Sequence, residues 1–120
     1  MRTITGHKVN YPNDLVDIHA VDDPGPGGAN HHYVLDVKDS DAERTTIRFQ
    51  KGPIVEAGVN GITHEALIAI VIDRLQAFQR GPYACRENAL ALTKLEEAQH
   101  WLHHRTRQRM DRGVEGTSAT

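Results

Sequence analysis

The sequence is poor in several features that define large classes of protein. Its 120 residues include a single cysteine, Cys85, which excludes a disulfide framework and a zinc site built from several thiolates. No apolar run approaches the roughly 20 residues of a membrane-spanning helix, and residues 1–20 lack the hydrophobic segment of a signal peptide. Lys and Arg total 14 against 16 Asp and Glu, a balance that argues against binding to DNA or RNA. We therefore expect a small protein of a reducing cytoplasm that binds neither membranes nor nucleic acids.

Aromatic residues are also scarce, with three Tyr, two Phe and one Trp, and hydrophobic residues make up 38% of the chain. A chain of this length is about one domain and buries roughly two-thirds of the surface that its unfolded form exposes. We expect residues 1–120 to form a single domain with a modest core, to which burial against a second copy would add.

The N-terminal half has the pattern of strands and turns. Residues 15–21 alternate apolar and polar side chains apart from Ile18, and residues 31–37 are a further strand candidate. Residues 44–50 alternate apolar and polar side chains, as a half-buried strand does. A dense Pro and Gly segment at 23–30 separates the first two, and a short polar connection suited to a hairpin separates the last two. Residues 1–50 therefore predict a small antiparallel sheet.

The C-terminal half has helical periodicity. The first helix is predicted over 64–79, with Thr63 as its N-cap and Gly81-Pro82 as its stop. The second is predicted from about 85 to 112, with Gly113 as its stop. Because the linker is short, the two should form an antiparallel hairpin over 63–112, followed by a loose tail over 113–120. The predicted class is α+β.

Charge is divided unevenly between these halves. Residues 1–60 carry six basic and nine acidic side chains, whereas residues 61–120 carry eight and seven. Four arginines crowd into residues 105–112, and arginine suits bidentate binding of phosphate or carboxylate. The same cluster could be a solvated helix end, where cations stabilise the macrodipole.

Heptad-like spacing along the second helix predicts a packed seam with polar ends. Its members are Ala84, Asn88, Ala91, Leu95, Ala98, Leu102, Arg105 and Arg109. Asn88 is equally well explained as a register-setting residue or as part of a site, whereas two successive arginines on a seam favour a buried anion.

The two polar ends of the seam cannot form one pocket within a single chain. Asn88 and Arg105 are seventeen residues apart, or about 25 Å along one helix. A second copy packed antiparallel would bring its arginines beside the elbow of the first hairpin, near Phe78, Tyr83 and Asn88. Such a composite provides stacking, amide hydrogen bonds and phosphate neutralisation, which together suit a nucleotide at a subunit interface.

Other polar residues permit a different hypothesis. Glu97 and His100 form a Glu-x-x-His pair, and His104 follows one turn later, so a metal-dependent helical-hairpin enzyme is the alternative. Solvent-facing histidines are the simpler interpretation. Cys85 fits a packing or capping role better than catalysis, and no nucleophile motif or phosphate-binding loop is present.

Several short motifs in the same order resemble a known family. They are Phe49–Ile54, Gly58–Gly61, Arg74–Pro82, Cys85–Ala89, Leu92–Ala98, Trp101–Arg109 and Arg112–Thr117. Together, from about residue 44 to 117, they resemble the phage-encoded Thoeris anti-defence sponge proteins of the first type. These proteins share a helical hairpin with the anti-CBASS cyclic-nucleotide sponges.

The resemblance implies a binding protein without catalytic residues, metal or cofactor. Members of this family sequester, without cleaving it, a glycocyclic isomer of ADP-ribose made by bacterial TIR-domain proteins, so that the downstream effector is not triggered. The ligand lies between two subunits, family members can assemble to hexamers, and the expected location is the host bacterial cytoplasm. Some members also hold cyclic di- or trinucleotides. Carried over by position, the ligand-binding residues are Phe78, Asn88, Arg105 and Arg109, with Tyr83 as a stacking residue at the elbow.

Overall fold

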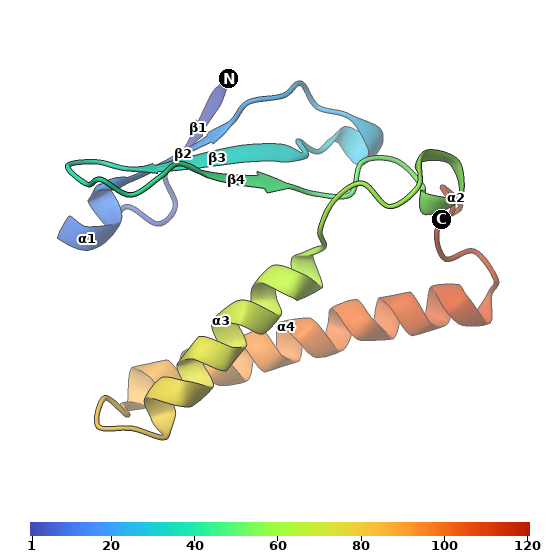
Figure 1. Ribbon diagram of the computed structural model, residues 1–120. Helices are drawn as coiled ribbons and strands as arrows, with labels where there is room; N and C mark the ends of the chain where they lie inside the picture. The colour runs from blue at the N-terminus through green and yellow to red at the C-terminus, as the bar shows by residue number, and fades with distance from the viewer. The chain divides into compact units, whose positions relative to one another are not determined.

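The computed structural model describes all residues from 1 to 120, and the chain divides into two compact units, Met1–Ile62 and Thr63–Thr120. The elements of the first unit are β1 (Arg2–Ile4), α1 (Tyr11–Asp14), β2 (Val16–Ala20), the 3₁₀ turn η1 (Pro26–Gly28), β3 (His32–Val37), β4 (Thr45–Arg48) and α2 (Ile54–Ala57). Those of the second unit are α3 (His64–Gln79) and α4 (Arg86–Asp111). No helix is long and apolar enough to cross a membrane. The α+β class and the order of sheet and hairpin are confirmed (Figure 1).

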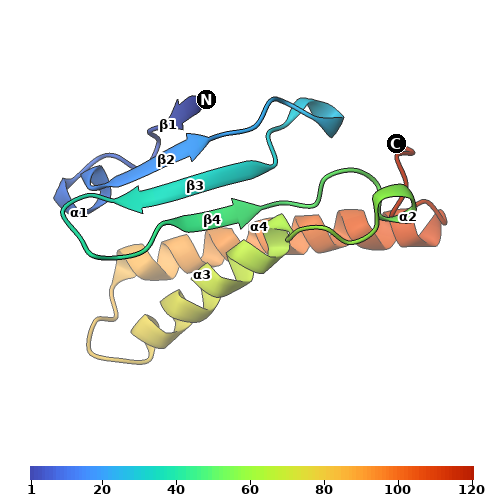
Figure 2. The ribbon, with the colours of Figure 1, turned by 45° about the horizontal axis from the view of Figure 1, so that its top comes forward.

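The first unit is a four-stranded antiparallel sheet in the order β1-β2-β3-β4, seen side by side in Figure 2. Three of its strands are the predicted ones, and β1 was missed because its three residues are too short for a periodic pattern. The buried apolar side chains are Ala20 and Val34. The core is therefore small, as the composition predicts.

A tight loop follows β4 and returns the chain to the edge of the sheet. Phe49 and Ile62 form a parallel bridge, and between them the side chains of Gln50 and Asn60 bond the backbone of the opposite arm. Gly61 is required here because a Cβ at this position would lie 2.6 Å from the backbone nitrogen of Gln50. The loop is thus locked by its own polar side chains.

The second unit is an antiparallel helical hairpin whose bounds agree with the predicted ones. The Thr63 hydroxyl accepts a hydrogen bond from the Ala66 N–H at 3.2 Å and caps α3. The Cys85 thiol accepts one from the Asn88 N–H at 3.4 Å and caps α4, so the capping role considered for Cys85 is the observed one. The Gln99 amide donates to the Glu65 carbonyl at 2.9 Å, which places the start of α3 beside the middle of α4. The last turns of α4 therefore extend beyond α3.

The seam of α4 differs in part from the predicted one. The half-buried or buried positions, which repeat with heptad spacing, are Asn88, Leu92, Leu95, Gln99, Leu102, Thr106 and Arg109. Ala91, Ala98 and Arg105, which the predicted seam included, are exposed. The two seams share Asn88, Leu95, Leu102 and Arg109 and differ at the positions between them. Leu92 is covered in place of Ala91 because it buries more apolar surface, and Gln99 in place of Ala98 because its amide bonds the Glu65 carbonyl.

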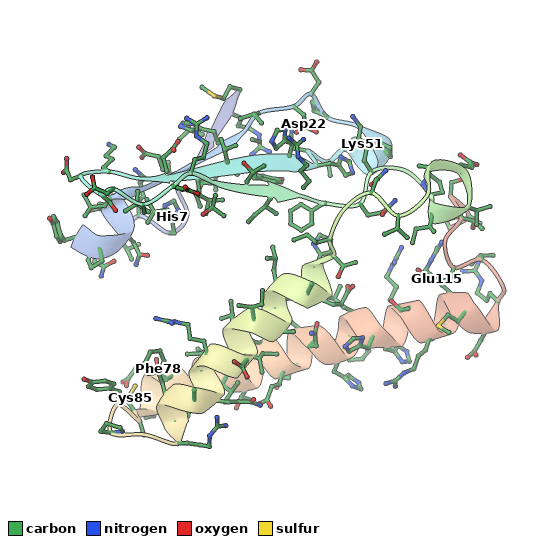
Figure 3. All side chains as sticks on the ribbon, viewed as in Figure 1. His7, Asp22, Lys51, Phe78, Cys85 and Glu115 are labelled. Atoms are coloured by element: carbon green, nitrogen blue, oxygen red, sulfur yellow. The ribbon has the colours of Figure 1, made fainter.

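The C-terminal residues differ from the predicted loose tail. Gly113 has a φ of 73° and ends α4, as predicted, and the chain then folds back against the last turns of the helix. Figure 3 shows Glu115 above this end of α4. The buried guanidinium of Arg109 holds these residues in place.

Candidate functional site

The elbow of the hairpin gathers two of the predicted site residues. The rings of Phe78 and Tyr83 meet edge to face, with centroids 6.3 Å apart and planes at 62°. The guanidinium of Arg74 lies over the Phe78 ring, 5.0 Å from its centroid, in a cation–π arrangement. Tyr83 remains 72% exposed. The elbow therefore presents an aromatic surface that is still open to solvent.

The backbone of the elbow is fixed by a reciprocal pair of hydrogen bonds. The Gln79 side chain donates to the Cys85 carbonyl at 3.0 Å and accepts from the Cys85 N–H at 3.1 Å. Figure 3 shows Phe78 and Cys85 at this end of the hairpin. Asn88 lies in the first turn of α4, and its side-chain amide makes no hydrogen bond within the chain. Its donor and acceptor are thus available to a ligand.

The other end of α4 forms a basic cavity of about 360 Å³. Its lining consists of Arg105, Gln108, Arg109, Arg112 and Thr117–Thr120. Arg105 is exposed, whereas Arg109 is only 8% exposed. The Arg112 guanidinium donates to the Thr120 carbonyl at 2.9 Å. Arginine side chains and hydroxyl-bearing residues form a cavity suited to an anion.

Arg109 is held by the tail. It donates to the Glu115 carboxylate at 3.1 Å and to the carbonyls of Val114, Thr117 and Ala119 at 3.0, 3.0 and 2.6 Å. A buried guanidinium is costly unless it is paired, and these four bonds compensate it. The anion inferred from its place on the seam is therefore, within this chain, the Glu115 carboxylate.

The structure thus gathers the predicted residues into two groups. Phe78 and Tyr83 lie at the elbow close to the first turn of α4, and Arg105 and Arg109 share the cavity at its far end. Asn88 and Arg105 are seventeen residues apart on one continuous helix, so the two groups are about 25 Å apart. One copy of the chain does not form the composite site.

The histidines of α4 form an aromatic cluster. The rings of His100 and His104 are stacked, with centroids 6.3 Å apart and planes at 17°, and Trp101 packs edge-on against both. Because the nitrogen lone pairs of histidine lie in the ring plane, stacked rings do not converge on one ion. The Glu97 carboxylate lies 3.8 Å from the Lys94 ammonium group, with which it forms an ion pair. No group of three or more His, Cys, Asp or Glu side chains could hold a metal ion in this chain.

Sequence reasoning missed a second cavity of about 240 Å³, in the N-terminal unit. Its lining includes His31 and His32 together with Arg48 and Lys51. No spacing along the chain reveals this grouping, because it arises only when β3 pairs with β4 and places His32 opposite Arg48.

Comparison with known proteins agrees with this architecture. Residues 41–107, more than half of the chain, match the family model described as "Acb2/Tad1, hairpin domain". Over 90 residues the chain is 57% identical to "Thoeris anti-defense 1" of Bacillus phage SBSphiJ7. That match covers 75% of this chain but 63% of the relative, so the chain spans less than two-thirds of the relative's length. The chain belongs to the Acb2/Tad1 hairpin-domain family.

Proposed function

We propose that this protein is a phage anti-defence sponge. It binds a cyclic isomer of ADP-ribose made by bacterial TIR-domain immune proteins and retains it without cleavage, so that the Thoeris effector is not activated. The observation that supports this most strongly is the basic cavity at the end of α4, in a chain 57% identical to a Thoeris anti-defence protein. The proposed ligand-binding residues are Phe78, Tyr83, Asn88, Arg105 and Arg109.

The chemistry of the two groups matches the parts of such a ligand. An ADP-ribose isomer has a diphosphate, an adenine base and ribose hydroxyls. The exposed Arg105 guanidinium offers a bidentate fork to phosphate oxygens, while the Phe78 and Tyr83 rings offer a stacking surface to the base. The unpaired Asn88 amide suits a base edge or a hydroxyl. Retention of a signal requires slow release rather than chemistry.

Two copies are needed to complete this site. The groups are separated by about 25 Å on one helix, so one copy would supply the elbow and another the arginine end. The hairpin also exposes large apolar side chains that a second copy could cover, namely Ile70, Val71, Leu90 and Trp101. We propose a symmetric dimer with two equivalent sites as the building block of a larger assembly, for which the family resemblance implies a hexamer.

A mixing experiment tests the composite site directly. Asn88→Trp blocks the elbow and Arg105→Ala removes the exposed fork, so each variant alone should lose at least about 90% of ligand binding. After the two variants are mixed, unfolded and refolded together, half of the dimers are mixed, and each of these contains one site with both halves intact. Titration with the cyclic ADP-ribose isomer should then recover about a quarter of the wild-type sites.

The matched control is Arg107→Ala, which removes the same charge from an exposed position two residues further along α4, on the opposite side of the helix, and should bind as the wild type does. Size-exclusion chromatography checks that each variant still assembles. Absence of recovery after mixing would place the two groups in separate sites. Unchanged affinity in both single variants would place the ligand elsewhere.

A further inference from the structure

A second cavity lies in the N-terminal unit, where β3 begins and β4 ends. Figure 3 shows Asp22 and Lys51 at this end of the sheet. We propose that this cavity is a binding site for a phosphate group, either the free ion or the end of a small phosphate monoester. It is independent of the arginine cavity of α4, because no lining residue is shared.

Two of its donors come from paired strands. His32 and Arg48 are directly opposite each other in the antiparallel register, and the Arg48 Nη1 lies 3.4 Å from the His32 Nδ1. Because arginine only donates hydrogen bonds, Nδ1 of His32 is the acceptor of this contact. The other N–H groups of Arg48 and the second ring nitrogen of His32 remain for a ligand in the cavity that both residues line.

The third donor is the ammonium group of Lys51. The backbone of Lys51 is fixed by the Asn60 side chain, which accepts a hydrogen bond from the Lys51 N–H at 2.8 Å and donates one to the Lys51 carbonyl at 2.7 Å. Lys51 Cε and His31 Nδ1 each lie 3.4 Å from the point that a Cβ on Gly25 would occupy, so both side chains border the same small space. The Lys51 ammonium has no ion-pair partner, and His31 Nδ1 is buried without a hydrogen-bond partner.

The one acid in the wall is already satisfied. The Asp22 carboxylate accepts from the backbone N–H groups of His31 and His32 at 3.0 and 3.2 Å and from the Asn30 amide at 3.4 Å. Burial raises the pKa of Asp22, but the hydrogen bonds from these donors lower it by a larger amount, so the pKa lies below its ordinary value. The carboxylate is therefore ionised at neutral pH. It is hydrogen-bonded by neutral donors and forms no ion pair with Arg48 or Lys51, so the wall carries two cations and one anion.

Size and geometry define the class of anion. Pockets for drug-sized ligands measure about 300–1,000 Å³, and this cavity of about 240 Å³ is smaller, so it suits a phosphate group rather than a whole dinucleotide. Donors from the strand pair and from the loop approach from different directions. That arrangement fits the several oxygens of a tetrahedral phosphate better than a planar carboxylate.

Equilibrium dialysis with radiolabelled inorganic phosphate tests the proposal on the full chain. We expect saturable binding of one phosphate per chain, weakened about tenfold or more in both Arg48→Gln and Lys51→Gln, since each removes a charge-assisted hydrogen bond. Both side chains are exposed, so the variants should fold, and circular dichroism checks this. Arg44→Gln, on the residue preceding β4 and outside the cavity, removes an equal charge and should bind within about twofold of the wild type.

Two further arms separate the possible sources of the signal. Competition by glycerol 3-phosphate, but not by the larger adenosine 5′-monophosphate, would assign the site to small monoesters. Failure of both to compete would assign it to the free ion. Arg105→Gln should retain phosphate binding, which distinguishes this site from the arginine cavity of α4. The proposal is overturned if the wild type shows no saturable binding up to about 10 mM phosphate, if both cavity variants bind normally, or if Arg44→Gln or Arg105→Gln causes the same loss.

Discussion

Replacement of Arg109 should release the C-terminal residues while leaving α4 intact. The guanidinium makes four hydrogen bonds to residues 114–120, and apart from the Arg112 contact with Thr120 these are the side-chain bonds that join the tail to the helix. In Arg109→Ala all four are lost. In Arg109→Lys the ammonium keeps the charge, but it has three donors and no planar fork.

The magnitude follows from these bonds. A hydrogen bond to a charged group contributes about 1.5–3 kcal/mol to stability. The bond between Arg109 and the exposed Glu115 carboxylate contributes less, because water screens that carboxylate. Loss of at least one such bond in Arg109→Lys should lower the free energy of opening the tail by about 2 kcal/mol, or about 30-fold in the open population. Arg109→Ala should leave the tail open.

Hydrogen exchange measures this opening. The Thr117 N–H bonds the Val114 carbonyl and the Ala119 N–H bonds the Thr117 hydroxyl, so these two amides report on the folded tail. Their exchange should accelerate about 30-fold in Arg109→Lys and approach the unstructured rate in Arg109→Ala. Amides in the centre of α4 should not change, and Arg107→Ala should behave as the wild type. Tail amides that exchange equally fast in the wild type and in Arg109→Ala would refute this interpretation.

Three further predictions concern the scaffold. Gly61→Ala should destabilise the chain to urea by about 2 kcal/mol or more, since its Cβ overlaps the backbone, whereas Gly6→Ala, with open space around it, should change stability little; equal effects would contradict the close approach. Cys85→Ser should raise the free energy of unfolding by about 0.5 kcal/mol and Cys85→Ala should lower it, because a hydroxyl accepts the capping bond better than a thiol; thermal unfolding of the two variants decides this. The hydrogen bond from Lys8 holds the pKa of Asp17 below its ordinary value, although desolvation raises it and Lys38 lowers it further. The ionised Asp17 therefore stabilises the folded state above about pH 4, and this stabilisation is lost as the pH falls through the lowered pKa. Urea midpoints measured between about pH 5 and about pH 3 should therefore fall less in Lys8→Met than in the wild type, and a parallel fall would contradict this.

Much of the fold could be predicted because local signals and packing agree. Thr63, Gly81 and Gly113 begin or end the helices where their capping and turn chemistry indicates. The strand candidates 31–37 and 44–50 pair as a hairpin, which the alternation of 44–50 and the short polar connection both favour. The three-residue β1 has no pattern of its own, since its pairing with β2 depends on a partner distant in sequence.

The site could be predicted only in part, for a physical reason. Heptad spacing placed Asn88 and Arg109 on the packed face but also placed Arg105 there, since a shift of one residue in register is not visible in a stripe of alanines. The partners of Arg109 come from a tail with no periodicity, so its burial could not be foreseen. Likewise, the cavity beside Lys51 depends on cross-strand register and on a loop that doubles back, neither of which sequence spacing encodes.

Sequestration without cleavage is the central claim, and recovery of the ligand tests it most directly. The cyclic ADP-ribose isomer is incubated with excess protein and filtered, the protein is then denatured by heat, and the released nucleotide is identified by mass spectrometry. We predict that free ligand falls below detection after incubation and returns at its original mass, in nearly full amount, after heating. Recovery of a hydrolysed product, or ligand that stays free in the filtrate, would contradict the account.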